Sequence, residues 1–145
     1  MQNIERHSLL EQISFGFKCA KIVCLIGSRQ VGKTTLARTL WSQRSDLSKG
    51  AYFDLERSSD LNALDNADLV LPSLRGLIII DEIQRKKELF PYLRYLHDLH
   101  LDQQFLLLGS ASREVLAQSG ESLAGRITYN PSFGLGDREP DRRFL

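Results

Sequence analysis

The chain has 145 residues, 42% of them hydrophobic, which is long enough for one domain with a packed core and too short for two ordinary domains. Its formal net charge of +1 gives no electrostatic reason to expect a nucleic-acid or membrane surface. Because the sequence has only two cysteines, no signal-like N-terminal segment and no apolar run of membrane-spanning length, we expect a reduced, cytoplasmic protein with no membrane partner.

Residues 1–20 are predicted to form a lead-in helix that delivers the chain to the first strand. Apolar residues recur there at helical spacing, namely Leu9, Leu10, Ile13 and Phe17. The pair Phe15-Gly16 is expected to end this helix. The apolar run that follows Lys21 then predicts a buried strand.

A phosphate-binding loop is predicted directly after this strand. Gly27, Gly32, Lys33 and Thr34 fill the fixed positions of the pattern G-x-x-x-x-G-K-[ST]. The glycines let successive backbone N–H groups turn toward a phosphate chain, a path that a Cβ atom at either position would obstruct. The predicted nucleotide-binding residues are Gly27, Ser28, Arg29, Gln30, Val31, Gly32, Lys33, Thr34 and Thr35.

Lys33 and Thr34 have the most specific predicted roles in this loop. The Lys33 ammonium would lie against the β- and γ-phosphates, and the Thr34 hydroxyl would enter the coordination shell of Mg²⁺. The positive N-terminal end of the following helix would also favour phosphate binding. A surface turn is the alternative, but the loop is joined to a helix whose apolar face is formed by Leu36, Ala37, Leu40 and Trp41.

Strands and helices alternate along the rest of the chain, which predicts an α/β fold with a mostly parallel sheet and right-handed crossovers. The predicted strands are Gly50–Leu55, Leu77–Asp81, Phe105–Leu108 and Ile127–Tyr129. The predicted helices are Ser58–Ala67, Glu88–Leu101, Arg113–Gln118 and Glu121–Ala124. We therefore expect a core domain over residues 1–129 and an irregular tail over residues 130–145.

Asp81 and Glu82 form the second predicted constellation. In an open parallel sheet ligands gather at the carboxyl ends of the strands, which is where a buried apolar run delivers this acidic pair. Asp81 would hold Mg²⁺ through water together with Thr34, and Glu82 would be the base or water-orienting group. A glutamate in this place favours hydrolysis over phosphate transfer to a metabolite. A solvated strand end is the alternative, which the nearby loop makes less favoured.

Three other features have simpler interpretations. The basic cluster Arg85–Lys87 is expected to be solvated surface. His97 and His100 lie one helical turn apart but lack a third zinc-type ligand. Tyr92 and Tyr95 are best explained as packing residues of an amphipathic helix. The sequence also has no N-K-x-D motif, which argues against guanine as the base.

With both motifs present, the chain resembles the AAA+ superfamily, in particular the prokaryotic AAA_14-type ATPase domain, from about Ile4 to Ile127. The resembling segments are Gly27–Leu36, Tyr52–Leu55, Ile78–Arg85, Glu88–Pro91, Phe105–Ser110 and Glu121–Arg126. The resemblance implies a three-layer P-loop NTPase fold with a parallel five-stranded sheet in the order 5-1-4-3-2. It also implies ATP as the ligand, Mg²⁺ as the cofactor and ATP hydrolysis as the reaction.

Two more residues acquire expected catalytic roles from this resemblance. Ser110 resembles the polar sensor between the nucleotide and the attacking water, although a plain turn residue is the alternative. Arg126 is a candidate arginine finger that would reach the γ-phosphate on a neighbouring subunit, which requires a homo-oligomer. An ordinary surface arginine explains Arg126 equally well.

Members of this family usually continue into a winged-helix region and a nuclease-like C-terminal domain, and AAA+ proteins complete the adenine pocket with a helical lid. Residues 130–145 are too few and too irregular to form that lid, so the chain resembles a truncated member. Two functions therefore remain open: a Mg²⁺-dependent ATPase, or a nucleotide-responsive module that binds a protein or DNA partner through the missing region without turnover of its own. A small-molecule kinase is least favoured.

Overall fold

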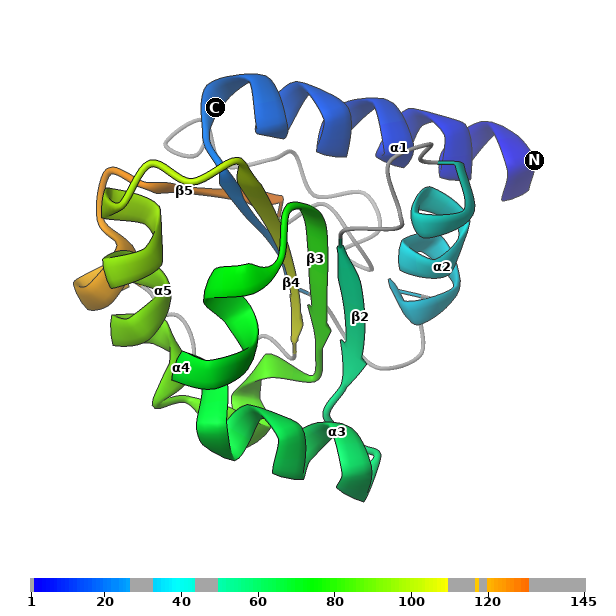
Figure 1. The fold of residues 1–145 in the computed structure, drawn as a ribbon. Helices are drawn as coiled ribbons and strands as arrows, with labels where there is room; N and C mark the ends of the chain where they lie inside the picture. Colours follow the sequence, from blue (N-terminus) through cyan, green and yellow to red (C-terminus); the bar gives the residue numbers. More distant parts are fainter. Residues whose placement is uncertain (1, 27–32, 44–49, 110–116, 118–119, 131–145) are drawn as a thin grey trace.

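The computed structural model describes residues 2–26, 33–43, 50–109, 117 and 120–130 (Figure 1). The predicted loop at 27–32, Ser110, most of the predicted helix at 113–118 and the tail from residue 131 onward lie outside this part. Predictions made for those residues therefore stay predictions. The strands are β1 (Ile22–Ile26), β2 (Ala51–Asp54), β3 (Gly76–Asp81), β4 (Gln103–Gly109) and β5 (Ile127–Asn130).

Helices separate these strands along the chain. The α-helices are α1 (Gln2–Cys19), α2 (Lys33–Gln43), α3 (Ser58–Ala63), α4 (Ala67–Val70) and α5 (Leu89–Asp98). Short 3₁₀ turns are η3 (Leu64–Asn66), η4 (Leu71–Ser73) and η5 (Ile83–Lys86). Residues 120–123 are also helical. Within the described residues, no helix combines the length and the apolar character that crossing a bilayer requires.

The strands form one sheet in the order β2-β3-β4-β1-β5, and every neighbouring pair is parallel. β1, β4, β3 and β2 form the body of the sheet, and β5 pairs with the outer side of β1. The α/β fold with a parallel sheet that the sequence predicts is thus confirmed. β4 separates β1, which leads into the predicted loop, from β3, which carries Asp81.

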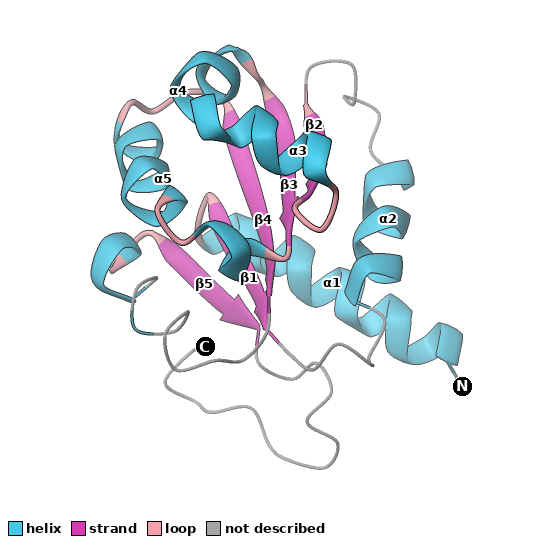
Figure 2. Ribbon diagram, turned by 90° about the horizontal axis from the view of Figure 1, so that it is seen from below, coloured by secondary structure: helices cyan, strands magenta, loops and turns pink. Residues whose placement is uncertain are grey.

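Helices cover both faces of the sheet, which gives three layers (Figure 2). In β3, Leu77 and Ile79 join side chains of α1 and α2 in one core cluster. Ile78 and Ile80 join side chains of α4 and α5 in the other cluster. Both strand faces are therefore buried, which is why the central strands read as continuous apolar runs. Each fully buried Leu or Ile side chain stabilises the fold by about 1.5–3 kcal/mol.

Helix α2, which begins just after the predicted loop, is anchored by the apolar face that the sequence predicts. Leu36, Ala37 and Leu40 are buried, and Trp41 packs partly buried against the same cluster. The cluster also contains Ile13 of α1, so α1 and α2 share one face of the sheet. The end of α2 nearest the loop is therefore held against the sheet.

Two predicted helix ends are wrong. α1 continues to Cys19, past the predicted stop at Phe15-Gly16, because the Gly16 carbonyl still accepts a hydrogen bond from the Ala20 N–H at 2.9 Å. α5 stops at Asp98, before the predicted end at Leu101. It stops there because His100 has a positive φ of 57°, which a right-handed helix cannot contain.

The predicted helix Ser58–Ala67 is also broken up. It is divided into α3, the turn η3 and the start of α4, since Asn66 has φ −114° and ψ 53°, outside the helical region. η3 nevertheless matters for packing, because Leu64 is fully buried in the core beside α5.

The basic cluster Arg85–Lys87 is not uniformly solvated, in contrast to the prediction. Lys86 keeps only 8% of its side chain exposed and forms ion pairs with Asp65 of η3 and, at 3.5 Å, with Glu88. These partners raise the pKa of the Lys86 ammonium, the hydrogen bond to Asp65 being the main cause. Lys86 therefore joins η5 to η3, and Arg85 is exposed as predicted.

Candidate nucleotide-binding site

The carboxyl ends of β1, β4 and β3 lie at one edge of the sheet. Ile26, after which the predicted loop begins, is paired in register with Gly109, after which Ser110 follows. Asp81 ends β3, one residue beyond the pair Ile80 and Leu107. The β1 and β3 backbones are two strand spacings apart, about 10 Å. The strand ends that lead into the predicted loop, into Ser110 and into the acidic pair therefore lie at the same edge.

Asp81 lies at this edge with only 2% of its surface exposed. Alternate residues of a strand lie on the same face, so Asp81 shares with Leu77 and Ile79 the face of β3 that packs against α1 and α2. The Tyr52 hydroxyl donates a hydrogen bond to its Oδ2 at 3.3 Å. Burial, with the Asp81 carboxylate adding to it, raises the pKa of Tyr52, so the hydroxyl remains a donor at neutral pH.

Glu82 follows in the left-handed conformation, with φ 61° and ψ 47°. A non-glycine residue rarely adopts this conformation, and it is sustained only where the surroundings hold it. The residue is also only 9% exposed, and the Gln84 amide donates a hydrogen bond to Glu82 Oε2. The carboxylate is consequently held near the edge by a neighbour in η5.

Gly109 at the end of β4 packs against the same turn. A Cβ atom at position 109 would lie 2.9 Å from Ile83 Cγ2 and 3.0 Å from Gln84 Oε1, so these side chains would have to shift to make room for it. Gly109 therefore lets the Ile83 and Gln84 side chains of η5 pack closely against the end of β4. Through Gln84, the position of the Glu82 carboxylate is linked to the strand that precedes Ser110.

Asp54, whose role the sequence leaves open, is the register partner of Asp81 in the β2–β3 pair. Its Oδ1 accepts a hydrogen bond from the Glu56 N–H at 3.0 Å, and the Asp54 N–H donates to Asp60 Oδ2 at 2.9 Å. This carboxylate thus stabilises the turn after β2, while Glu56 itself is exposed. As the register partner of Asp81, Asp54 places a second acid at the carboxyl edge.

Arg126 lies at the opposite, amino edge of the sheet, because it directly precedes β5 and Ile127 pairs with Ile22 at the start of β1. Four or five residues separate the two edges, about 15 Å. Its guanidinium binds the Asp98 carboxylate in a bidentate manner, Nε to Oδ1 at 2.8 Å and the second contact to Oδ2 at 3.1 Å. Hydrogen bonds from Arg126 and then His97 lower the pKa of Asp98.

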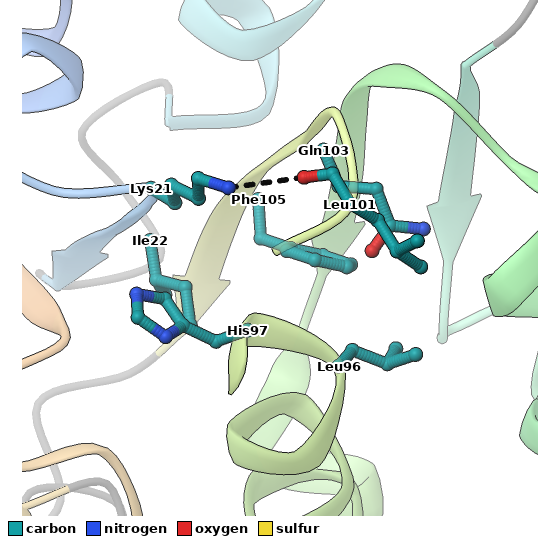
Figure 3. A pocket seen from close by; sticks show the side chains of 7 residues that line it. All are labelled: Lys21, Ile22, Leu96, His97, Leu101, Gln103 and Phe105. Carbon is teal, nitrogen blue, oxygen red and sulfur yellow. Dashed lines mark hydrogen bonds between the residues drawn. The ribbon is translucent and has the colours of Figure 1, made fainter. Parts of the chain in front are cut away.

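A small pocket also lies at the amino edge (Figure 3). There the Lys21 ammonium donates a hydrogen bond to the Leu101 carbonyl at 3.0 Å, above the Ile22 and Phe105 side chains. The space between the lining side chains is too narrow for a water molecule. This pocket is therefore no ligand site, and it is far from the acidic pair.

The donor groups at the carboxyl edge fit Mg²⁺ better than a transition metal. Within the described ranges, no group of three or more His, Cys, Asp or Glu side chains is placed to hold a metal ion, and His97 instead contacts Asp98 at 3.0 Å. Mg²⁺ prefers oxygen ligands and is usually held by one or two carboxylates plus phosphate oxygens and water. The Asp81 carboxylate, at the same edge of the sheet as the start of the loop, is a ligand of that kind.

Among the predicted site residues that the structure describes, Asp81 and Glu82 lie at the carboxyl edge and Arg126 lies at the amino edge. Asp81 and Glu82 lie at the edge where the predicted loop begins, and α2 begins with Lys33 and Thr34, whose side chains lie outside the described part. Thr35 is exposed in the first turn of α2. Arg126 is remote from all of them within its own chain.

Sequence reasoning missed Tyr52 and Gln84, which contact the two acidic side chains directly. The only available signal for Tyr52 was its place two residues before Asp54, on the same strand face as the acid. Gln84 gave no local signal, since its contact depends on the backbone conformation of Glu82.

Two solved structures with a similar fold are an NTPase domain and an ATPase. The P-loop NTPase domain of the sigma-54 transport activator from E. coli aligns with a TM-score of 0.56 at 18% identity, covering 90% of this chain and 94% of that one. The Walker-type ATPase PABY2304 of Pyrococcus abyssi aligns with a TM-score of 0.58 at 15% identity, covering 89% of this chain and 51% of that one. At these identities the likeness concerns the fold.

Curated relatives share more sequence but are much longer. Uncharacterised proteins of Mycobacterium bovis and Mycobacterium tuberculosis are each 39% identical over 137 residues, which is 94% of this chain. The chain spans 30% of the length of these relatives.

The profile of the AAA_14 family, described as an AAA domain, matches residues 20–139. The match includes β1, the predicted loop, the acidic pair and the segment around Arg126. Together with the P-loop fold, this membership indicates that the chain binds a nucleotide. The chain therefore belongs to the AAA_14 family of AAA-type P-loop ATPase domains.

Proposed function

We propose that the chain binds ATP with Mg²⁺ at the carboxyl edge of the sheet and hydrolyses it to ADP and phosphate. The observation that supports this most is the buried acidic pair at the end of β3, at the same edge as the start of the loop. Asp81 accepts a hydrogen bond from Tyr52 and Glu82 accepts one from Gln84, so both carboxylates have hydrogen-bond donors at this edge. Preorganised acidic groups at such an edge suit phosphate chemistry.

The proposed roles divide between phosphate binding and water activation. Residues 27–32 with Lys33 and Thr35 would hold the phosphates, while Thr34 and Asp81 would hold the metal ion. Bound Mg²⁺ would neutralise the charge that develops on the transferring phosphate. Glu82 would accept a proton from the attacking water or orient it, and Ser110 would contact the γ-phosphate.

Two substitutions test this proposal. Lys33→Ala should abolish ATP binding measured by calorimetry, because a compact charge against the phosphates is lost. Glu82→Gln should retain ATP binding but lower phosphate release by about 10²–10⁴-fold, the usual contribution of a general base. Lys18→Ala and Glu121→Gln change exposed residues of the same types and should behave as wild type. Normal hydrolysis by Glu82→Gln would show that the assigned mechanism is wrong.

A second function is favoured by the position of Arg126. Within its own chain this arginine is bound to Asp98 at the opposite edge, so any contact with a γ-phosphate must occur on a neighbouring subunit. The chain would then be a nucleotide-responsive binding module that turns over only in a homo-oligomer or with a protein or DNA partner. Sedimentation with and without ATP tests this. Phosphate release by the monomeric chain well above that of Lys33→Ala would argue against it.

A further inference from the structure

Tyr52 connects three elements at the carboxyl edge. Its ring meets Trp41 of α2 edge-on, with ring centroids 6.2 Å apart and an interplanar angle of 78°. The Arg38 guanidinium, also from α2, lies 4.8 Å from the centre of the Tyr52 ring. Its hydroxyl meanwhile reaches Asp81 on the neighbouring strand at 3.3 Å. One side chain on β2 thus contacts both α2 and the end of β3.

The ring and the hydroxyl of Tyr52 contact different elements. The ring contacts hold Tyr52 to α2, while the hydroxyl donates its hydrogen bond to Asp81 Oδ2. α2 and β2 lie side by side in both views of the fold (Figures 1 and 2). The Tyr52 side chain is therefore a direct connection between α2 and Asp81 Oδ2.

We propose that Tyr52 is the positioning residue for the metal-holding carboxylate of Asp81. Its hydroxyl fixes the orientation of the carboxylate, and its ring ties that orientation to helix α2. A divalent cation held by Asp81 then meets a carboxylate whose rotamer is already set. This inference rests on the proposed function, because it assigns the control of metal affinity within the same site. Such outer contacts commonly change metal affinity by about 10–100-fold.

A purely structural tyrosine would give the same picture at rest. Tyr52 would then be a half-buried strand residue whose hydroxyl bonds to the nearest acceptor, and its loss would lower only the stability of the fold. The two roles differ in one measurable quantity, the concentration of Mg²⁺ that half-saturates the nucleotide complex.

The test uses Tyr52→Phe, which removes the hydroxyl and keeps the ring contacts with Trp41 and Arg38. Trp41 is the only tryptophan of the chain, so its fluorescence reports the α2 contact without interference. Mg²⁺ is titrated into the chain saturated with ATP-γ-S, and the half-saturating concentration is read from the fluorescence. We expect it to rise about 10-fold. Tyr92→Phe, which removes the hydroxyl of a tyrosine stacked on Tyr95 in α5, should titrate like wild type.

Asp81→Asn separates the failure of this inference from the failure of the proposed function. If Asp81→Asn loses the Mg²⁺ response but Tyr52→Phe titrates within about 2-fold of wild type, Tyr52 has no positioning role and the proposed site stands. A lower unfolding midpoint for Tyr52→Phe with an unchanged titration leads to the same rejection. If Asp81→Asn titrates like wild type, the proposed metal site itself is wrong, and the inference is lost with it. Tyr52→Phe combined with Asp81→Asn should add no further change in Mg²⁺ affinity.

Discussion

At the scale of single residues, the left-handed conformation of Glu82 stands out because it occurs in the proposed catalytic group. The left-handed region costs an L-residue roughly 1–2 kcal/mol, so the surroundings must hold the residue there. The turn η5, the Gln84 amide and the close packing of Gly109 supply that support.

Comparing two Glu82 variants isolates the cost of the backbone conformation. Both Glu82→Gly and Glu82→Ala remove the carboxylate, but only glycine adopts a positive φ without penalty. We expect the free energy of unfolding of Glu82→Gly to exceed that of Glu82→Ala by about 1 kcal/mol, measured by urea denaturation. Equal stabilities would mean that the left-handed conformation carries no strain.

Gly109→Ala tests the contact that holds Gln84 in place. The new Cβ atom would press on Ile83 and on Gln84 Oε1, so the Gln84 amide should shift away from Glu82. Phosphate release should fall by about 10-fold, while ATP binding changes little, because most of the proposed phosphate-binding residues, 27–33 and Thr35, belong to another segment of the chain. Gly120→Ala is the matched control, since among the described residues, leaving out its chain neighbours and its own helix backbone, no atom lies within 4 Å of a Cβ at that position. Unchanged hydrolysis by Gly109→Ala would mean that the position of Gln84 does not affect catalysis.

At the scale of elements, the contact between the turns η5 and η3 depends on one buried lysine, Lys86. Lys86 of η5 reaches Asp65 of η3, and the two turns come from segments before and after β3. Burying an ammonium is costly unless a carboxylate compensates for the lost water. The Asp65 contact therefore stabilises the turn that also carries Gln84.

Asp65→Asn should lower the free energy of unfolding by roughly 1–3 kcal/mol, because Lys86 stays buried without its main partner. Glu88→Gln, which loses the longer 3.5 Å contact, is the matched control and should have a smaller effect. Since folding raises the pKa of Lys86, this stabilisation is complete below the ordinary lysine value of about 10.4 and is lost as pH rises through the higher folded value. Denaturation at pH 7 and pH 11 measures both effects. Equal losses in the two variants would contradict the assignment to Asp65.

At the scale of the whole molecule, the two edges of the sheet have different roles. The acidic pair and the start of the loop lie at the carboxyl edge. At the amino edge, the bidentate ion pair of Arg126 and Asp98 (the fork) joins the start of β5 to the end of α5. Because the fork lies on the far side, it stabilises the fold without touching the proposed site of its own chain. A neighbouring subunit that recruited Arg126 would have to break this fork.

Asp98→Asn should lower the thermal midpoint at neutral pH and low salt by a small amount, since the pair is exposed and screened. Folding lowers the pKa of Asp98, so its contribution is present above the ordinary value of about 3.9 and is lost as pH falls through the lower folded value. The difference in thermal midpoint between wild type and Asp98→Asn should therefore shrink below about pH 4. Asp102→Asn, another exposed aspartate, is the control. A gap that persists unchanged in acid would exclude the fork as its cause.

Much of the fold could be predicted because its signals are local. Apolar runs such as Leu77–Ile80 indicate doubly covered strands, and the spacing in α2 indicates its buried face. Helix ends were predicted less well, since the Gly16 hydrogen bond and the His100 conformation are set by packing around them. The placement of Asp81 and Glu82 at a strand end agrees with the prediction, while their roles remain predictions.

By itself, the sequence determined the alternation of strands and helices, the loop motif and the position of the acidic pair, because each depends on residues close together in the chain. Only the tertiary structure decided that Tyr52 contacts Asp81, that Lys86 is buried and that Arg126 lies at the other edge. Those contacts join residues 21 to 29 positions apart. They depend on strand order and register, which only long-range packing establishes.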